Sequence, residues 1–142
     1  SYYFLNILFC FIMEEYFNSE KHADYLKNNP GSGLLRIQVY TANQAFPLED
    51  VEVKVYKEID GKRVVFFNGV TDSSGIIDNI NLPTKEVKKD VESASDIMST
   101  DYIIEAKYPK TGVAQDYIVS IYDDLKVIQP IKFASVSGGI NE

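Results

Sequence analysis

The residues best suited to chemistry are few in this sequence, and they do not cluster. Histidine and cysteine each occur once, as His22 and Cys10. A catalytic or metal-binding histidine needs partner groups, and a cysteine within an apolar run is a small inert hydrophobe. The sequence also has no CxxC, HExxH, GxxxxGK or GxSxG pattern. We therefore expect a protein that is not an enzyme, with no catalytic residue, cofactor or metal site, and with His22 at the surface.

Carboxylates are numerous, but their positions fit turns better than a reactive site. Asp123 and Asp124 are neighbours where a turn is expected. Asp72, followed by two serines, offers few of the roughly six to eight oxygen ligands that calcium takes. We interpret these aspartates as turn residues, because an Asp side chain accepts hydrogen bonds from nearby backbone N–H groups.

Exposed tyrosines are the more informative polar residues. Tyr40 and Tyr56 fall on the outward phase of their predicted strands, and Ile103 and Ile118 are apolar residues on the same off-core phase. Such residues predict an aromatic binding patch. The alternative is that both faces of the sheet are partly covered, for example by an N-terminal helix.

The elements that would position these residues are strands. After Gly33, seven segments have a pattern typical of strands: apolar residues either alternate with polar ones or form a short apolar run. These segments are residues 35–40, 51–59, 64–70, 76–82, 102–108, 114–121 and 125–133. Turn signals such as Asp60-Gly61 separate most of these segments, and no spacing fits a βαβ unit. The pattern predicts an all-β fold, a seven-stranded antiparallel β-sandwich with a short N-terminal helix.

The N-terminal 32 residues differ from the rest. Residues 2–13 are an almost unbroken apolar run, too short for a membrane-spanning helix and without the flanks of a signal peptide. Three interpretations stay open: a degenerate targeting or anchoring segment, a buried helix, or extra sequence upstream of a start at Met13. Residues 13–28, with Tyr16 and Phe17 on the apolar face, have the spacing of an amphipathic helix, and 29–33 have the composition of a linker. The expected organisation is an apolar segment, helix and linker over 1–32, a sandwich over 33–135 and a flexible tail over 136–142.

The charge of the chain limits the classes of partner that it is expected to bind. The net charge is −7, which opposes binding to nucleic acid. The 17-residue polar stretch 84–100 is long for a connection, and such loops are often functional or disordered. Its Lys85, Lys88 and Asp96 are therefore candidate binding residues, as are Tyr16 and Phe17 of the predicted helix. Contact with a membrane is not expected.

An ordered set of short segments runs through the chain. It comprises GLLRIQV at 33–39, FPLEDVEV at 46–53, TDSSG at 71–75, Leu82-Pro83 and YIIEA at 102–106. This order resembles carboxypeptidase regulatory-like domains, and most narrowly the N-terminal pro-region of the spore cortex-lytic enzyme of anaerobic spore-forming bacteria. The resemblance covers about residues 33–134 and implies a transthyretin-like (prealbumin-like) sandwich. It carries over no catalytic residue, because the matched segments are turns and core positions.

The expected function follows from two observations: the sequence has no catalytic motif, and it resembles the pro-region of the cortex-lytic enzyme. In the cortex-lytic enzyme the similar domain precedes a peptidoglycan-cleaving domain and is removed on activation. We therefore expect a non-catalytic binding or accessory module, protein-binding, chaperone-like or inhibitory, linked to a cell-wall or spore peptidoglycan hydrolase. One alternative is a module that binds carbohydrate or peptidoglycan itself. Another is a structural subunit of a phage-like or surface assembly, in which copies of the chain form a homo-oligomer. The bacterial cytoplasm, the spore and the cell envelope all stay open as locations.

Overall fold

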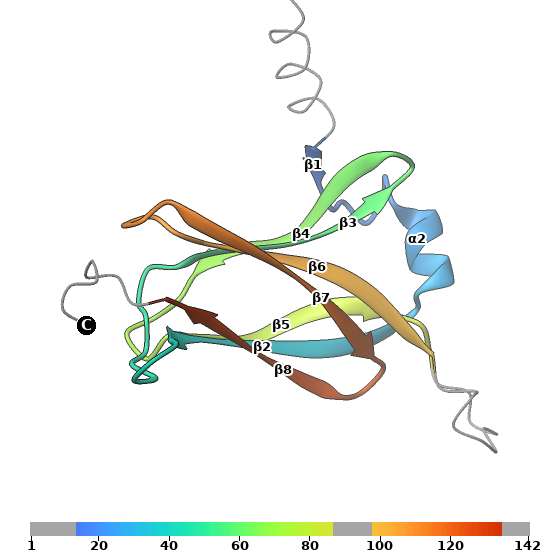
Figure 1. Cartoon of the computed structure of the whole chain (residues 1–142). Coiled ribbons are helices and arrows are strands. Elements are labelled where there is room, and N and C mark those ends of the chain that lie inside the picture. Colours follow the sequence, from blue (N-terminus) through green and yellow to red (C-terminus); the bar gives the residue numbers. More distant parts are fainter. Residues whose placement is uncertain (1–13, 87–97, 135–142) are drawn as a thin grey trace, which may run out of the picture.

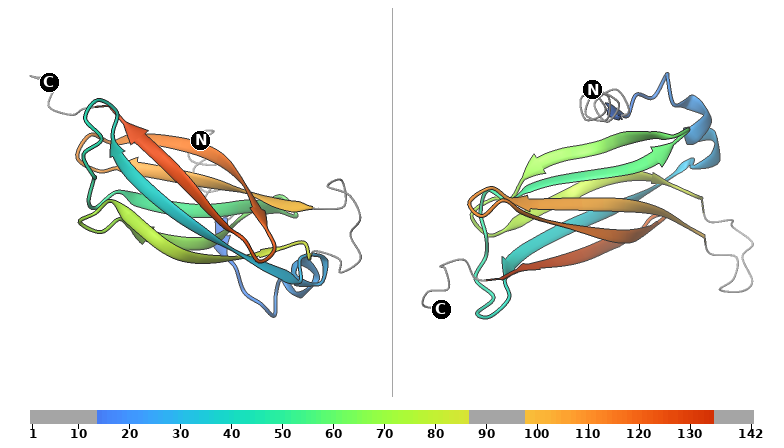
Figure 2. Two further views of the ribbon diagram at one scale, coloured as in Figure 1. Left: turned by 90° about the horizontal axis from the view of Figure 1, so that it is seen from below. Right: turned by 45° about the horizontal axis from the view of Figure 1, so that its top comes forward.

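In the computed structural model, which describes residues 14–86 and 98–134, eight strands form two facing sheets (Figure 1). Sheet A has the order β1 (Glu14–Tyr16), β4 (Lys62–Val70), β3 (Glu52–Ile59), β6 (Ser99–Tyr108) and β7 (Val113–Tyr122). Sheet B has the order β5 (Ile76–Thr84), β2 (Gly31–Thr41) and β8 (Lys126–Phe133), and these strands lie side by side in Figure 2. The helix α2 (Ala23–Asn28) lies at one end of the sandwich, beside the start of β2.

The core lies between the two sheets, and alternation along the strands builds it. In β2, Leu35, Ile37 and Val39 are all but inaccessible to solvent, while the residues between them are half-buried. β3 and β6 bury their inward residues in the same way, and β7 and β8 contribute Val119, Ile121, Ile131 and Phe133. Burying one such aliphatic side chain stabilises the fold by about 1.5–3 kcal/mol.

The predicted fold class, an all-β sandwich with one short helix, is confirmed. The seven expected strands correspond to β2 through β8, and the eighth strand is β1. Two neighbouring pairs, β1–β4 and β2–β8, are parallel, whereas the sequence predicted antiparallel pairing throughout. β2 and β8 are not joined by a hairpin turn. The chain leaves sheet B after β2 and returns to it only after β7, so β8 can lie parallel to β2.

The segment 13–28 was predicted as one helix, and this prediction is wrong over most of its length. Glu14–Tyr16 form β1, and only Ala23–Asn28 are helical. Between them, the Asn18 side chain accepts hydrogen bonds from the backbone N–H groups of Glu20 and Lys21, which fixes a turn. Pairing with the edge of β4 outweighs the local helical pattern at residues 14–16, since tertiary context overrides weak propensities. The predicted linker 29–33 is likewise shorter, because β2 begins at Gly31.

An aromatic cluster closes the end of the sandwich near α2. Phe17 stacks on Phe66, with ring centroids 4.6 Å apart, and the Phe66 ring meets Tyr102 edge-on at 5.0 Å. The Tyr25 hydroxyl donates to the Tyr102 hydroxyl (2.9 Å), which donates to the Pro83 carbonyl (2.5 Å). The cluster joins Phe17, which follows β1, to α2, β4 and β6, and the bond to Pro83 of β5 connects it to sheet B.

Candidate binding surface

The outer face of sheet A, which points away from the core, carries a row of apolar residues in register across all five strands. Tyr16 of β1 lies opposite Val65 of β4, which in turn lies opposite Tyr56 of β3. Tyr56 is opposite Ile103 of β6, and Ile103 is opposite Ile118 of β7. Residues opposite each other in a ladder share one face of the sheet. We call these five residues the apolar row.

The middle of the apolar row is covered and its two ends are open. Val65 and Tyr56 are 2% and 5% exposed, whereas Tyr16 is 60% exposed and Ile118 is 74% exposed. The Asn68 side chain donates a hydrogen bond to the Tyr16 hydroxyl (3.2 Å), which holds the exposed ring over β4. The row therefore presents two large apolar side chains to solvent from a well-packed centre.

Tyr56 is covered by Arg63, not by a helix. The Arg63 guanidinium lies 3.9 Å from the centroid of the Tyr56 ring, and its Nη2 donates to the Tyr56 hydroxyl (3.2 Å). Burial raises the pKa of Tyr56, with the carboxylates of Asp116, Glu105 and Glu58 adding to the rise while Arg63 opposes it. The phenol therefore stays neutral near pH 7, so it can serve as a hydrogen-bonding and stacking group, not as a nucleophile.

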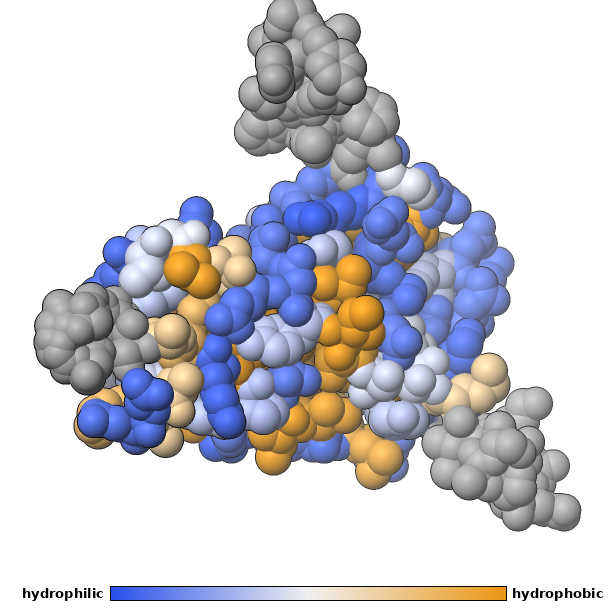
Figure 3. All heavy atoms as spheres, in the orientation of Figure 1, coloured by the Kyte–Doolittle hydropathy of each residue, from blue (hydrophilic) through white to orange (hydrophobic). Residues whose placement is uncertain are grey.

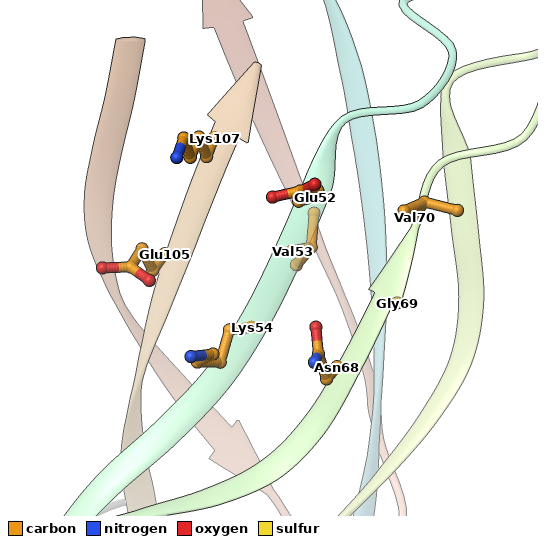
Figure 4. Close-up of a pocket in the computed structure, with 8 residues that line it drawn as sticks. All are labelled: Glu52, Val53, Lys54, Asn68, Gly69, Val70, Glu105 and Lys107. Carbon is orange, nitrogen blue, oxygen red and sulfur yellow. The ribbon is translucent and has the colours of Figure 1, made fainter. Parts of the chain in front are cut away.

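A shallow groove of about 540 Å³ lies on the same face, next to the apolar row. Figure 4 shows the side chains that line it on β3, β4 and β6: Glu52, Lys54, Asn68, Val70, Glu105 and Lys107. Charges alternate in both directions, because Glu52 lies opposite Lys107 and Lys54 lies opposite Glu105. The Lys54 amine bonds to Glu14 of β1 at 3.2 and 3.3 Å. The groove is thus mostly polar and open, and none of the residues that line it belongs to the apolar row.

The structure brings together only part of the predicted binding patch. Tyr56, Ile103 and Ile118 share the apolar row, and Tyr16 joins them from β1. Tyr40 does not, because it lies on β2 in sheet B, with the Lys132 amine 5.8 Å from its ring centroid. The residues predicted on β3, β6 and β7 therefore share one face of sheet A, whereas the grouping of Tyr40 with them is wrong.

The other predicted site residues lie elsewhere. Phe17 packs in the aromatic cluster at the end of the sandwich and does not belong to the open face. The half-buried Lys85 follows β5, and its backbone N–H donates to the Thr100 hydroxyl (3.0 Å). Lys88 and Asp96 lie outside the residues that the structure describes, as does Cys10.

His22 was expected at the surface, and that expectation is wrong. It is 8% exposed, stacks on Phe17 with centroids 5.3 Å apart, and places Nε2 2.7 Å from Glu15. Its contacts are those of a packing residue that joins the start of α2 to β1. The described residues contain no group of three or more His, Cys, Asp or Glu side chains arranged to hold a metal ion.

Two members of the surface were missed by sequence reasoning. Val65 lies on the outer face because the β3–β4 ladder has a register shift between Val55 and Tyr56, and a one-residue shift exchanges the two faces. Glu14 was placed on a helix, although Glu14 and Tyr16 are two residues apart, which is the spacing of one face of a strand. That spacing was the one feature of the sequence that could have indicated a strand here.

Comparison with known proteins does not assign this chain to a family. No family model and no curated protein matches the sequence. Among solved structures, transthyretin from Sparus aurata matches with a TM-score of 0.42 and 16% identity, over 69% of this chain and 90% of that one. The 5-hydroxyisourate hydrolase of Klebsiella pneumoniae matches with a TM-score of 0.43 and 17% identity, over 72% and 84% of the respective chains. At these values neither match indicates a family, an activity or a ligand of this chain.

None of the described residues form a helix with the length and apolar character that crossing a bilayer would require.

Proposed function

We propose that this domain is a non-catalytic binding module whose contact surface is the outer face of sheet A. The observation that carries the proposal is the apolar row, which runs in register from Tyr16 to Ile118 and ends in two largely exposed apolar side chains. Large apolar side chains exposed among polar ones often mark a protein-binding surface, and tyrosine is enriched among the strongest contacts of such surfaces.

We further propose that the partner is a cell-wall or spore peptidoglycan hydrolase, on which the domain has a chaperone-like or inhibitory role. Support for this comes from the resemblance of residues 33–134 to the pro-region of the cortex-lytic enzyme. The outer face is also rigid, because five paired strands hold it, and a rigid surface loses little entropy when a partner binds.

The test measures binding and hydrolysis together. The full chain is mixed with a purified spore cortex-lytic hydrolase, affinity is measured by calorimetry, and cleavage of purified peptidoglycan is followed with and without the chain. We expect binding and a change in the hydrolysis rate. Absence of both would contradict the assignment of this partner.

A matched pair of variants tests the surface. Ile118→Ser removes the exposed end of the apolar row, and Ile128→Ser removes an isoleucine that is 54% exposed on β8 of sheet B. We expect Ile118→Ser to weaken binding by about tenfold, in line with truncation of an interface side chain that contributes 1–2 kcal/mol, and Ile128→Ser to leave it unchanged. Equal losses in the two variants would place the contact elsewhere.

A second candidate is a module that binds peptidoglycan directly. The observation in its favour is the Tyr16 ring, which is 60% exposed and held by Asn68, as a platform for stacking on a sugar would be. Sedimentation with insoluble peptidoglycan separates the two proposals, since a protein-binding module stays in the supernatant. Co-sedimentation that Tyr16→Ser abolishes would favour the carbohydrate ligand.

A further inference from the structure

Three of the four edge strands in the described part of the chain have features that oppose pairing with another strand. β1 is only three residues long. β8 contains Pro130 and two lysines, and β5 contains Pro83 and a bulge at which Asn79 has a φ of 57°. Short length, proline, lysine and bulges are the usual protections of sheet edges, because an unpaired edge offers its backbone groups to any extended chain.

β7 has none of these protections. Its ten residues pair with β6 in ten consecutive register positions without a shift, and they include no proline, lysine or arginine. On its other side, no strand of the described residues pairs with it. In Figure 1 β7 passes in front of β6, and Figure 3, in the same orientation, shows apolar patches among polar residues over this region. Alternate N–H and C=O groups of β7 therefore point to solvent.

The end of β7 that crosses to sheet B is closed, which defines how much of the edge is open. The Thr84 hydroxyl donates to the Ile121 carbonyl (2.9 Å), and the backbone of Tyr122 lies against Gly33 of β2. Val113 to Ser120 remain, which is long enough for a strand of ordinary length.

The side chains beside this edge specify what would pair with it. Asp116 and Glu105 lie directly opposite each other on the outer face, and like charges so placed destabilise a sheet. Glu105 has Arg63 at 3.9 Å, but no lysine or arginine of the described residues forms an ion pair with Asp116. Two residues further along the same face, Ile118 ends the apolar row and is 74% exposed. Among the described residues, the edge thus presents a carboxylate without an ion-pair partner next to a largely exposed apolar side chain.

We propose that the β7 edge binds an extended segment of a partner protein as a sixth strand of sheet A, with a Lys or Arg beside Asp116 and an apolar residue beside Ile118. The inference rests on the proposed binding function and names the chemistry of its partner. Residues two apart share one face of a strand, so the segment carries a basic residue and an apolar residue separated by one position. Backbone hydrogen bonds provide the affinity and these two side chains the selectivity, as in other cases of strand addition. The net charge of −7 favours a basic segment further.

The experiment uses a terminally blocked peptide, Thr-Thr-Lys-Thr-Ile-Thr-Thr, and a control peptide with Glu in place of Lys. Both are titrated into the full chain while backbone amide shifts and amide hydrogen exchange are followed by NMR. We expect the Lys peptide to bind about fivefold more tightly than the Glu peptide, the range of a cross-strand charge pair, and to slow exchange in β7.

Charge reversal makes the test specific. Asp116→Lys is expected to reverse the preference, so that the Glu peptide binds more tightly. Glu49→Lys changes the net charge by the same amount at an exposed loop position and is expected to keep the preference for the Lys peptide. Equal affinity for the two peptides, or shift changes outside β7 and β6, would overturn the proposal. So would concentration-dependent protection of β7 without peptide, because the occupant would then be a second copy of the chain.

The outcomes separate this inference from the proposed function. If the hydrolase binds and β7 amides are unaffected by it or by the peptides, the edge proposal fails and the binding module stands. If β7 takes the Lys peptide but the hydrolase does not bind, strand addition is supported and the assignment of the hydrolase as partner fails.

Discussion

His22 Nε2 lies 2.7 Å from Oε2 of Glu15, and this contact joins the N-cap of α2 to β1. Lys21 and Lys62 approach the other carboxylate oxygen at 3.0 and 3.4 Å. The hydrogen bond from Lys21, followed by that from His22, lowers the pKa of Glu15 to about 2 against the opposing effect of desolvation. One carboxylate therefore gathers three basic side chains around the N-terminal segment.

Glu15→Gln is expected to lower the free energy of unfolding at pH 7, because the amide cannot accept charge-assisted hydrogen bonds of the same strength. The folded-state pKa of Glu15 is below its ordinary value of 4.5, so its contribution is fully present above about pH 4.5 and is lost as the pH falls towards 2. The difference between wild type and variant should shrink over that window. Urea unfolding at several pH values measures it, with Glu20→Gln, at an exposed position, as the control for charge. A difference that stays constant with pH would contradict the prediction.

Tyr102→Phe is expected to destabilise the sandwich by about 1–3 kcal/mol, the penalty for leaving buried hydrogen-bonding groups without a partner. Tyr102 is 0% exposed, its hydroxyl connects Tyr25 to the Pro83 carbonyl, and burial, followed by the hydrogen bond with Tyr25, raises its pKa far above the ordinary value. Tyr25→Phe keeps the bond to Pro83 and should cost less. Chemical denaturation of the two single variants and the double variant gives the coupling free energy between the two hydroxyls. Additive losses in the free energy of unfolding would show that the hydroxyls act independently.

Gly75 and Gly112 form a matched pair, because their φ angles are +74° and +75° but their surroundings differ. A Cβ at Gly75 would lie 2.3 Å from the Val39 carbonyl oxygen, whereas a Cβ at Gly112 would meet nothing within 4 Å. Gly112→Ala is expected to cost about 1–2 kcal/mol from the left-handed backbone alone. Gly75→Ala should cost about 1–3 kcal/mol more, because the turn must move away from β2. Equal losses of thermal stability would contradict the crowding argument.

Ile118→Ser and Ile104→Ser separate binding from folding. Ile118 is 74% exposed at the end of the apolar row, so its replacement should change the free energy of unfolding by less than about 0.5 kcal/mol. Ile104 is 0% exposed on the inner face of β6, and its replacement should cost about 2–5 kcal/mol. A large loss of stability in Ile118→Ser would mean that the residue serves the fold, and its use as a test of binding would fail.

The sequence predicted the strands well because hydrophobic period and turn chemistry are local. Strand segments 51–59 and 125–133 and the turn at Asp60-Gly61 all appear as expected, with Asp60 and Gly61 both at positive φ. The predictions that were wrong concern features that depend on pairing between strands distant in the sequence. Glu14–Tyr16 become a strand only because β4 offers a free edge, and Val65 faces outward only because of a shift relative to β3.

The candidate surface was predictable to the same extent. Tyr56 and Ile118 could be assigned to outer faces from their phase, but phase does not say which of the two sheets a strand joins. Tyr40 was therefore grouped with residues on the opposite layer. The burial of His22 could not be inferred either, because it depends on Glu15 and Phe17 folding back from β1.

β1 has a consequence for where the domain can be cut. Its three residues supply the Tyr16 end of the apolar row and cover the outer edge of β4. A truncation at residue 33, the boundary suggested by the sequence, would remove both and would also shorten β2. It would leave the apolar β4, with Val64 to Phe67, as an uncovered edge open to aggregation. The smallest piece that keeps both the fold and its surface therefore starts at or before Glu14.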